Sequence, residues 1–289
     1  MLKTRIVGVI VVKGGIVVQS IGFARYLPVG SVAIAVEYLN RWGIDEIVLL
    51  DIDATAQDRP PQFDAIREYS KFCQVPLTVG GGIKTVADME RLVHSGADRI
   101  AINAAALENP ALIEEGARHL GSQCIVVSID ARRRQNGEYR VYSHSGTRAT
   151  PYDALTCAKR AEDAGAGEIF LTSIDRDGSK QGYDLDLLGS VAAAVNIPVV
   201  VCGGAGHPRH LLEAIGTGVS GVAAANFYHY TEHSVIVAKS YLKAAGANVR
   251  LDSYVTYEGF RFDDDGRAAK IDDAALDKLR FEVIPEEVI

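Results

Sequence analysis

The sequence predicts one closed barrel of eight parallel strands surrounded by helices, a (β/α)₈ barrel built from two duplicated halves. Three observations predict this fold. The chain has 289 residues, 48% of them hydrophobic, which is near the usual size of an α/β barrel taken as one domain. Short β-branched runs alternate with longer segments of helical period, which is typical of βα units. The two halves of the chain also resemble each other.

Eight short apolar runs predict the strands. They cover residues 5–12, 46–52, 76–80, 99–103, 123–129, 168–173, 198–202 and 221–225. The segments between them predict helices over residues 31–42, 61–73, 85–95, 109–119, 152–164, 184–194, 207–217 and 234–245. Asp184 precedes a Leu-rich run and Pro208 lies in a first turn, which are both helix-start signals. Eight such units favour a closed barrel, and periodicity alone leaves a doubly wound sheet as the alternative.

The internal repeat divides the predicted barrel into two halves of four βα units. The matching segments are residues 46–53 with 168–175, 75–82 with 197–204, and 5–11 with 124–130. A repeat this long lies outside the roughly 20 to 50 residues of solenoid proteins. We therefore interpret it as a duplicated half-barrel.

Two glycine-rich turns end equivalent strands. Residues 80–82 are three glycines, and residues 203–206 read Gly-Gly-Ala-Gly. Carboxyl ends of barrel strands form the active face, glycine lets the backbone approach a ligand, and a following helix offers unpaired N–H groups to a phosphate. Tight turns without a ligand are the alternative. Because Asn103 and Asn226 follow neighbouring strands, we favour two phosphate cradles and a long ligand with a phosphate at each end.

Carboxylates gather at the same strand ends, where they can act as general acids or bases if their surroundings shift their pKa. They are Asp51, Asp53, Asp130, Asp175 and Asp177. Asp53 and Asp175 are repeat equivalents whose alternative role is to accept hydrogen bonds from loop amides. Asp130 is the strongest catalytic candidate, and the three arginines at residues 132–134 are expected to keep it ionised. The position equivalent to Asp130 in the first half is Val11, so an acid/base pair across the mouth would lack one carboxylate.

Residues 1–252 resemble the cyclase subunit of imidazole glycerol phosphate synthase. The runs TVGGGI, GAGEIFLTSIDRDG and GYD carry the resemblance. Members of this family are half-barrel duplications that take ammonia from a partner glutaminase, and split and cyclise a bisphosphate in histidine synthesis. The resemblance implies phosphate binding by one set of residues in each half: Gly82 and Asn103, then Asp177, Gly178, Gly203, Gly204 and Asn226. It also implies a polar ligand-facing set of Asp51, Thr172, Ser173 and Asp175.

The resemblance breaks down where the family does its chemistry. The two essential aspartates of the family fall on Val11 and Asp130, and its flexible-loop lysine falls on Gln19. Valine transfers no proton, and general acid/base steps are each worth a factor of about 10² to 10⁴, so we expect the lyase and cyclase turnover to be severely impaired.

The opposite barrel face matches the family at the charged ring that gates its ammonia passage. The ring residues are Arg5, Glu46, Arg99 and Glu168, with Asp98 at a position that the family presents to its glutaminase. Salt-bridged packing of the barrel floor is the alternative reading of this ring. The sequence shows no cysteine–histidine arrangement for glutamine hydrolysis, so ammonia is expected from a glutaminase subunit.

Three functional hypotheses follow. The first is an ammonia-conducting subunit similar to the amidation-associated relatives of the cyclase, which serve an N-sugar amidotransferase in lipopolysaccharide synthesis; the stretch LDIDAT at residues 50–55 supports it. The second is a working cyclase of histidine biosynthesis. The third is a phosphate-binding regulatory barrel.

Residues 253–289 extend past the usual end of the family. Residues 255–271 predict a hairpin and residues 272–280 a helix capped by Asp272. A docking arm for an oligomer or for the amidotransferase and a solvent-facing ornament are both consistent with this pattern.

Composition excludes several other classes. A formal net charge of −7 argues against nucleic-acid binding, which needs a positive excess. No apolar run approaches the roughly 18 residues of a membrane span, so we expect a cytoplasmic protein without membrane contact. The four cysteines at 73, 124, 157 and 202 are widely spaced and predict reduced core residues. The histidines show no ligand spacing, so neither a metal nor another cofactor is indicated.

Overall fold

Eight parallel strands close into a ring in the computed structural model, which describes residues 2–230, 233–251, 257 and 260–276. The ring strands are β1 (Arg5–Lys13), β4 (Glu46–Asp51), β5 (Leu77–Gly80), β6 (Arg99–Ile102), β7 (Ile125–Arg133), β10 (Glu168–Ser173), β11 (Val199–Cys202) and β12 (Gly221–Ala224). Pairing of β10 with β7 and of β12 with β1 completes the circle. The predicted (β/α)₈ barrel is therefore confirmed.

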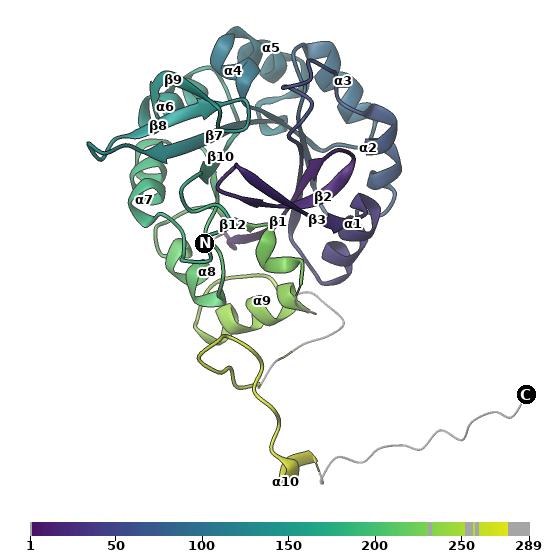
Figure 1. Cartoon of the computed structure of the whole chain (residues 1–289), viewed down its shortest axis with the longest axis vertical. Coiled ribbons are helices and arrows are strands. Elements are labelled where there is room, and N and C mark those ends of the chain that lie inside the picture. The colour runs from purple at the N-terminus through teal and green to yellow at the C-terminus, as the bar shows by residue number, and fades with distance from the viewer. Residues whose placement is uncertain (1, 231–232, 252–256, 258–259, 277–289) are drawn as a thin grey trace, which may run out of the picture.

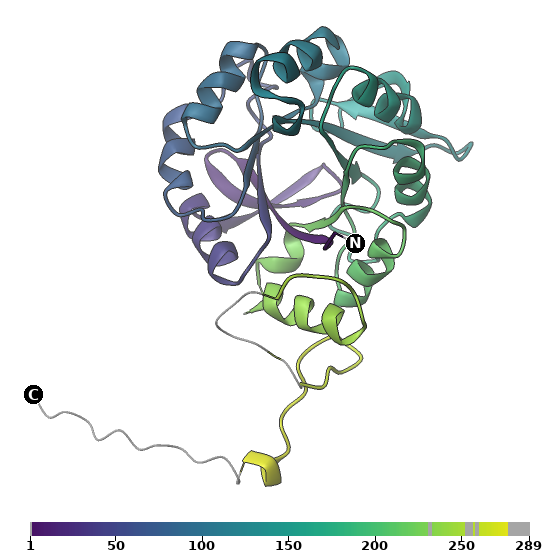
Figure 2. The same cartoon turned by 180° about the vertical axis from the view of Figure 1, so that it is seen from behind.

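Helices surround this ring on all sides, as Figures 1 and 2 show from opposite ends of the barrel. They are α1 (Val32–Arg41), α2 (Phe63–Ser70), α3 (Val86–His94), α4 (Ala104–Glu108), α5 (Ala111–Leu120), α6 (Ala154–Asp163), α7 (Leu185–Ala194), α8 (Pro208–Ile215) and α9 (Ser234–Ala244). The Asp184 side chain accepts a hydrogen bond from the amide of Leu187, and Pro208 begins α8. Both predicted start signals thus operate. The segment 99–124 differs from the prediction, because α4 and a 3₁₀ turn at Ser122–Cys124 flank α5.

Two antiparallel hairpins on the barrel mouth were not predicted. β2 (Ile16–Ile21) and β3 (Arg25–Gly30) continue β1, while β8 (Tyr139–Ser143) and β9 (Arg148–Asp153) continue β7. Since β1 and β7 are repeat equivalents, the duplication extends into these hairpins. The turn between β2 and β3 reaches across the mouth toward β10 (Figure 1).

Alternation along the strands sorts side chains between two apolar clusters. Residues 6, 10 and 12 of β1 belong to the cluster between the ring and its helices, whereas Val7, Val9 and Val11 belong to the cluster inside the ring. Successive side chains of a strand point to opposite faces. Arg5, two residues before Val7, therefore lies on the same inward face as Val11. A rise of about 3.3 Å per residue separates Arg5 from Val11 by about 20 Å along β1.

The chain beyond the barrel packs on α8 and α9. A bridge between Phe262 and Ala268 forms a short turn, and the His207 imidazole Nε2 lies 2.9 Å from the carbonyl oxygen of Asp264. The helix α10 covers Asp273–Leu276, with the Asp272 carboxylate accepting from the Ala274 amide. Predicted elements at residues 252–256, 258–259 and 277–280 lie outside the described residues.

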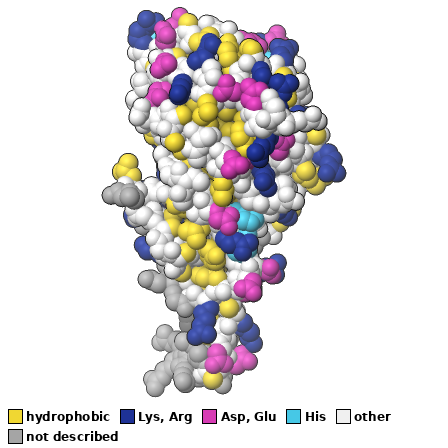
Figure 3. Space-filling model, turned by 90° about the vertical axis from the view of Figure 1, so that its left-hand side faces the viewer, with side chains coloured by type: hydrophobic (Ala, Val, Ile, Leu, Met, Phe, Trp, Pro, Cys, Tyr) yellow, Lys and Arg dark blue, Asp and Glu magenta, His cyan; other side chains and the backbone are white. Residues whose placement is uncertain are grey.

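Surface charge is mixed on the face that Figure 3 presents. Basic and acidic side chains are interspersed there, with small apolar patches between them. Among the described residues, no helix has the length and apolar character required to cross a membrane.

Candidate functional site

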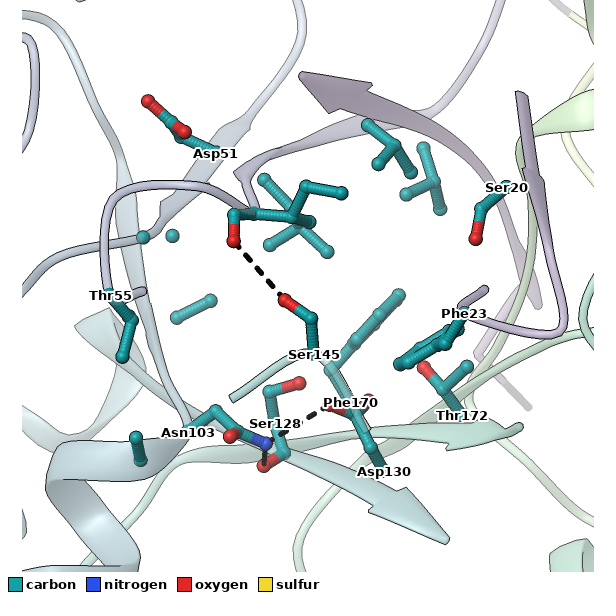
Figure 4. A pocket seen from close by; sticks show the side chains of 18 of the residues that line it. Ser20, Phe23, Asp51, Thr55, Asn103, Ser128, Asp130, Ser145, Phe170 and Thr172 are labelled. Carbon is teal, nitrogen blue, oxygen red and sulfur yellow. Dashed lines mark hydrogen bonds between the residues drawn. The ribbon is translucent and has the colours of Figure 1, made fainter. Parts of the chain in front are cut away.

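A pocket opens at the carboxyl ends of the strands, between the two hairpins (Figure 4). The space between its walls, with the solvent-filled mouth included, is about 1010 Å³. Its lining includes Val11, Ser20, Phe23, Asp51, Gly80, Gly81, Gly82, Asn103, Ser128, Asp130, His144, Ser145, Phe170, Thr172 and Asp177. Both halves of the barrel thus contribute to one pocket.

Asp130 lies deep in this pocket on β7. The Asn103 side-chain amide donates to Asp130 Oδ2 at 3.2 Å and to the carbonyl oxygen of Ser128 at 3.0 Å (Figure 4). Burial raises the pKa of Asp130 to about 7, with a further rise from the charge of Asp177 and an opposing hydrogen bond with Thr172. A carboxyl group with a pKa near neutrality can both give and take a proton at physiological pH.

The predicted electrostatic role of residues 132–134 is wrong. Arg132 lies 3.6 Å from Asp175, and Arg133 lies 3.8 Å from Asp186. Both side chains are at least a third exposed, and burial, the largest influence on Asp130, acts in the opposite direction. Asp130 is therefore set up as a proton donor near neutral pH rather than as a permanently ionised group.

Val11 occupies the position on β1 that Asp130 occupies on β7. Val11 pairs with Leu50 of β4, and Asp130 pairs with Thr172 of β10, the repeat partner of Leu50. Both residues line the same pocket. The asymmetry seen in the sequence is thus an asymmetry within one site: one wall carries a carboxyl group where the other carries an isopropyl group.

Asp53 and Asp175 serve the backbone in equivalent ways and do not line the pocket. Asp53 accepts from the Gly14 amide at 2.8 Å, and Asp175 accepts from the Arg133 amide at 2.8 Å. Lys13 is ion-paired with Asp53 at 2.7 Å. These contacts match the alternative reading of the pair, in which the carboxylates fix the ends of β1 and β7.

The first glycine-rich turn forms part of the pocket wall. Gly81 and Gly82 have φ angles of 120° and 73°, a region that other residues rarely adopt. A Cβ atom on Gly81 would lie 2.3 Å from the carbonyl oxygen of Asp51, and one on Gly82 would lie 2.4 Å from that of Arg59. Together with Asn103, these residues present a close backbone surface to a ligand.

The second predicted phosphate set is covered by the β2–β3 hairpin. Ser20 Oγ donates to Asp177 at 2.6 Å, the Phe23 amide donates to Asp177 at 3.2 Å, and Asn226 Nδ2 donates to the carbonyl oxygen of Ser20 at 2.7 Å. Asp177 is the one member of this set that lines the pocket, whereas Gly178, Gly203, Gly204 and Asn226 do not. Ser173, of the predicted polar ligand-facing set, also lies outside the lining. Gln19 lies on β2, also outside the lining.

Asp51 lies in the pocket wall, where its carboxylate is ion-paired with Arg59. Arg59 donates to both Asp51 carboxylate oxygens, at 2.8 and 2.7 Å. Both hydrogen bonds come from the single nitrogen Nη2, and they keep the carboxylate turned toward Arg59. Thr172, by contrast, faces the pocket beside Asp130.

The four predicted ring residues meet at the amino end of the barrel. Arg5 is bonded to Glu46 at 2.7 Å and also to Glu168, while Arg99 lies 3.0 Å from Glu46 and 3.2 Å from Glu168. Burial raises the pKa of Glu168 against the opposing charges of both arginines. The ring closes the floor of the barrel on the axis that leads to the pocket.

Asp98 lies beside this ring on the outer surface. It is exposed, and its carboxylate accepts from the Leu77 amide at 2.8 Å. The side chain therefore stabilises the start of β5 and remains accessible at the amino face.

Several pocket residues come from the hairpins that were not predicted. Ser20, Phe23, His144 and Ser145 all belong to them, and Gly146 packs against Phe23. The sequence did carry a signal for both hairpins. Gly14-Gly15 and Asn136-Gly137 are two-residue turn pairs between β-rich runs.

Comparison with known proteins agrees with the geometry. The family model described as "Histidine biosynthesis protein" matches residues 5–234. A Vibrio vulnificus (strain YJ016) protein provisionally named imidazole glycerol phosphate synthase subunit hisF2 is 45% identical over 268 residues, covering 92% of this chain and 98% of its own. Imidazole glycerol phosphate synthase subunit HisF of Bacillus cereus (strain G9842) is 46% identical over 252 residues, covering 87% of this chain and all of its own. The chain belongs to the histidine biosynthesis protein family and is similar to its HisF cyclase subunits.

Proposed function

We propose that this chain is a cyclase-type subunit that receives ammonia from a glutaminase and uses it on a phosphorylated carbonyl ligand bound in the pocket. The single observation that carries the proposal is the alignment of two sites on one barrel axis. The ring of Arg5, Glu46, Arg99 and Glu168 lies at the amino end, and the pocket around Asp130 lies at the carboxyl end.

The barrel interior between these sites suits ammonia as cargo. Val7, Val9, Val48, Val126 and Val200 belong to its apolar cluster. An uncharged molecule enters such a path at much lower cost than an ammonium ion, whose desolvation is unfavourable. The ion-paired ring at the entrance would therefore be the place where ammonium gives up its proton.

A partner glutaminase is expected because the two buried cysteines of this chain are poor nucleophiles. Burial raises the pKa of Cys157 to about 12 and that of Cys202 still further, whereas a nucleophilic cysteine needs a low pKa. The exposed Asp98 beside the ring supports docking at the amino face. Both relatives are named as subunits of a synthase.

The ligand we propose is phosphorylated at the end held by the first glycine turn. The backbone at Gly81 and Gly82 is open to close approach, and Asn103 lies next to it. The second phosphate set would become available only if the β2–β3 hairpin withdrew from Asp177 and Asn226. Residues 1–252 would form the functional barrel, with residues 253–289 as an extension.

Transfer of ammonia to an N-sugar amidotransferase is the second candidate, and Val11 is the observation that favours it. An apolar residue at this position removes one proton-handling group from the pocket. Neither relative is named for polysaccharide synthesis, and both names support the histidine-type reaction instead. We therefore place the cyclase-type function first.

The test is turnover of the bisphosphate intermediate of histidine synthesis by the purified chain with ammonium salt, followed by titration with a class I glutaminase. The proposal expects measurable turnover and binding of the glutaminase at the amino face. Glutaminase binding without turnover would favour the amidotransferase reading. Absence of both would leave only a phosphate-binding regulatory barrel.

A further inference from the structure

We propose that His144 is the second proton-transfer residue of the pocket, working with Asp130 in place of a carboxylate at position 11; this inference rests on the proposed function. His144 lies in the turn between β8 and β9, which brings it to the lining of the same pocket as Asp130 and Val11. In the other half of the barrel, the equivalent turn between β2 and β3 begins with Gly22 and not with a histidine.

The backbone at His144 is held in an unfavourable conformation. His144, Ser145 and Gly146 have consecutive φ angles of 52°, 53° and 77°. For residues other than glycine this costs on the order of 1 kcal/mol each and persists only where surrounding contacts impose it. Such strain is found at functional sites more often than elsewhere.

The contacts that impose this conformation come from both sides of the mouth. Thr147 donates to the carbonyl oxygen of His144 through its amide at 3.3 Å and its hydroxyl at 2.6 Å. Ser145 Oγ donates to the carbonyl oxygen of Ile52 at 3.1 Å, across the pocket mouth (Figure 4). The turn is thus tied to the first half of the barrel, which fixes the position of His144 in the pocket lining.

One ring nitrogen of His144 is engaged and the other is available. Nδ1 lies 3.0 Å from the hydroxyl of Ser143, a residue only 3% exposed. Within the described part of the chain, Nε2 has no hydrogen-bond partner. In many general bases, a neighbouring group binds one imidazole nitrogen and orients the ring. The other nitrogen can then take a proton from the reacting atom.

The other titratable groups of the pocket are engaged elsewhere. Asp51 is paired with Arg59, and Asp177 accepts from Ser20 and Phe23. Tyr26 donates its hydroxyl to the carbonyl oxygen of Phe23, and Cys202 is buried. Asp130 and His144 are the remaining titratable groups of the lining, and the proposal assigns the proton exchange with a ligand to them.

The two groups suit the addition of an amine to a carbonyl. The amine nitrogen forms a bond to the carbonyl carbon and gives a proton to His144 Nε2. The carbonyl oxygen takes a proton from the Asp130 carboxyl group and becomes a hydroxyl group. The imidazolium of His144 then protonates this hydroxyl group, which leaves as water as the C–O bond breaks and a C=N bond forms. The protonated imine nitrogen gives its extra proton through solvent to the Asp130 carboxylate, so both residues are regenerated and no oxidant or reductant is consumed.

The test compares His144→Asn with a control, His119→Gln, in the full-length protein. Asparagine tolerates the positive φ of this turn better than most residues, whereas His119 is an exposed residue of α5. With ammonium salt and the bisphosphate intermediate, kcat of His144→Asn is expected to fall about 100-fold or more, with KM changed less than about threefold. His119→Gln is expected to match the wild-type protein. Adding Val11→Asp to His144→Asn is expected to restore at least about tenfold in kcat.

Three outcomes separate the claims. Turnover by His144→Asn equal to wild type, with an unchanged melting temperature, overturns the role of His144 and leaves the proposed function intact. If His144→Asn melts several degrees lower, His144→Gln replaces it, and equal turnover there has the same meaning. Lack of turnover in the wild-type protein overturns the proposed function and this inference together, and it is recognised before any substitution is made.

Discussion

Val11 and Asp130 occupy equivalent positions on opposite walls of one pocket: Val11 pairs with Leu50, and Asp130 pairs with Thr172. The duplication that built the barrel therefore left a site with one carboxyl group where its symmetry has room for two. Proton transfer in the pocket therefore depends on Asp130 and on the other polar side chains that line it.

Replacing Val11 with aspartate is expected to raise the rate of the cyclase-type reaction at a cost in stability. Val11 is 9% exposed, so a carboxyl group there is poorly solvated and faces Asp130. The cost is on the order of 1–3 kcal/mol. Steady-state kinetics and thermal melts would measure both effects, with Val11→Asn as the matched control. An unchanged kcat with intact ligand binding would mean that the ligand site differs from the family at other positions too.

The stability of Asp130→Asn relative to wild type is expected to depend on pH. The pKa of Asp130 is raised to about 7 in the folded protein, from about 4 in the unfolded chain. The folded state therefore binds the proton more tightly, and wild-type stability falls as pH rises from about 4 to about 7. Asparagine does not ionise, so its advantage should be near zero at pH 4 and on the order of 4 kcal/mol at pH 8. Denaturant titrations that show a constant difference across this range would contradict the raised pKa.

Glu46 is expected to be essential to the ring. Its side chain is 1% exposed, and it accepts hydrogen bonds from Arg5, Arg99 and Thr78. Glu46→Ala removes a buried carboxylate and leaves two partly buried cations short of a partner, so it should destabilise the protein by about 3–5 kcal/mol. Glu90→Ala is the control, because the Glu90 side chain on α3 is 45% exposed and its loss should change stability by less than about 0.5 kcal/mol. Equal melting temperatures for the two variants would mean that the ring contributes little to stability.

Gly82→Ala is expected to abolish binding at the first cradle. A methyl group there would lie 2.4 Å from the carbonyl oxygen of Arg59, at a φ of 73°. Gly189→Ala is the control, since a Cβ atom at this position of α7 meets nothing within 4 Å. Alanine there should stabilise the helix by about 0.5–1 kcal/mol. Calorimetric titration measures the affinity of each variant for inorganic phosphate. Equal affinities of Gly82→Ala and Gly189→Ala would mean that the first glycine turn does not bind phosphate.

The fold could be predicted from the sequence because the repeat and the strand pattern are properties of the chain itself. The match of residues 46–53 with 168–175 recurs in the structure as the equivalent strands β4 and β10. The ring of charges could also be predicted, since Arg5 and Glu46 begin their strands and the amino ends of parallel strands meet at one face.

The parts that could not be predicted depend on distance and burial. Arg132 is two residues from Asp130 in sequence yet pairs with Asp175, so charge proximity along the chain gave the wrong ionisation state. The β2–β3 hairpin covers Asn226 through contacts made by residues more than two hundred positions apart. His144 could not be predicted as a pocket residue, because its turn reaches the pocket only through the pairing of β8 with β7.

Isotope tracing in the assembled complex shows whether ammonia passes through the barrel. The chain and its glutaminase would be supplied with glutamine labelled with ¹⁵N in the side-chain amide, in a buffer containing unlabelled ammonium, and the product would be examined by mass spectrometry. Passage through the ring and the barrel predicts a product that carries the glutamine label with little dilution. A product whose label matches the bulk ammonium pool would contradict this passage, because the nitrogen would then have reached Asp130 from solvent.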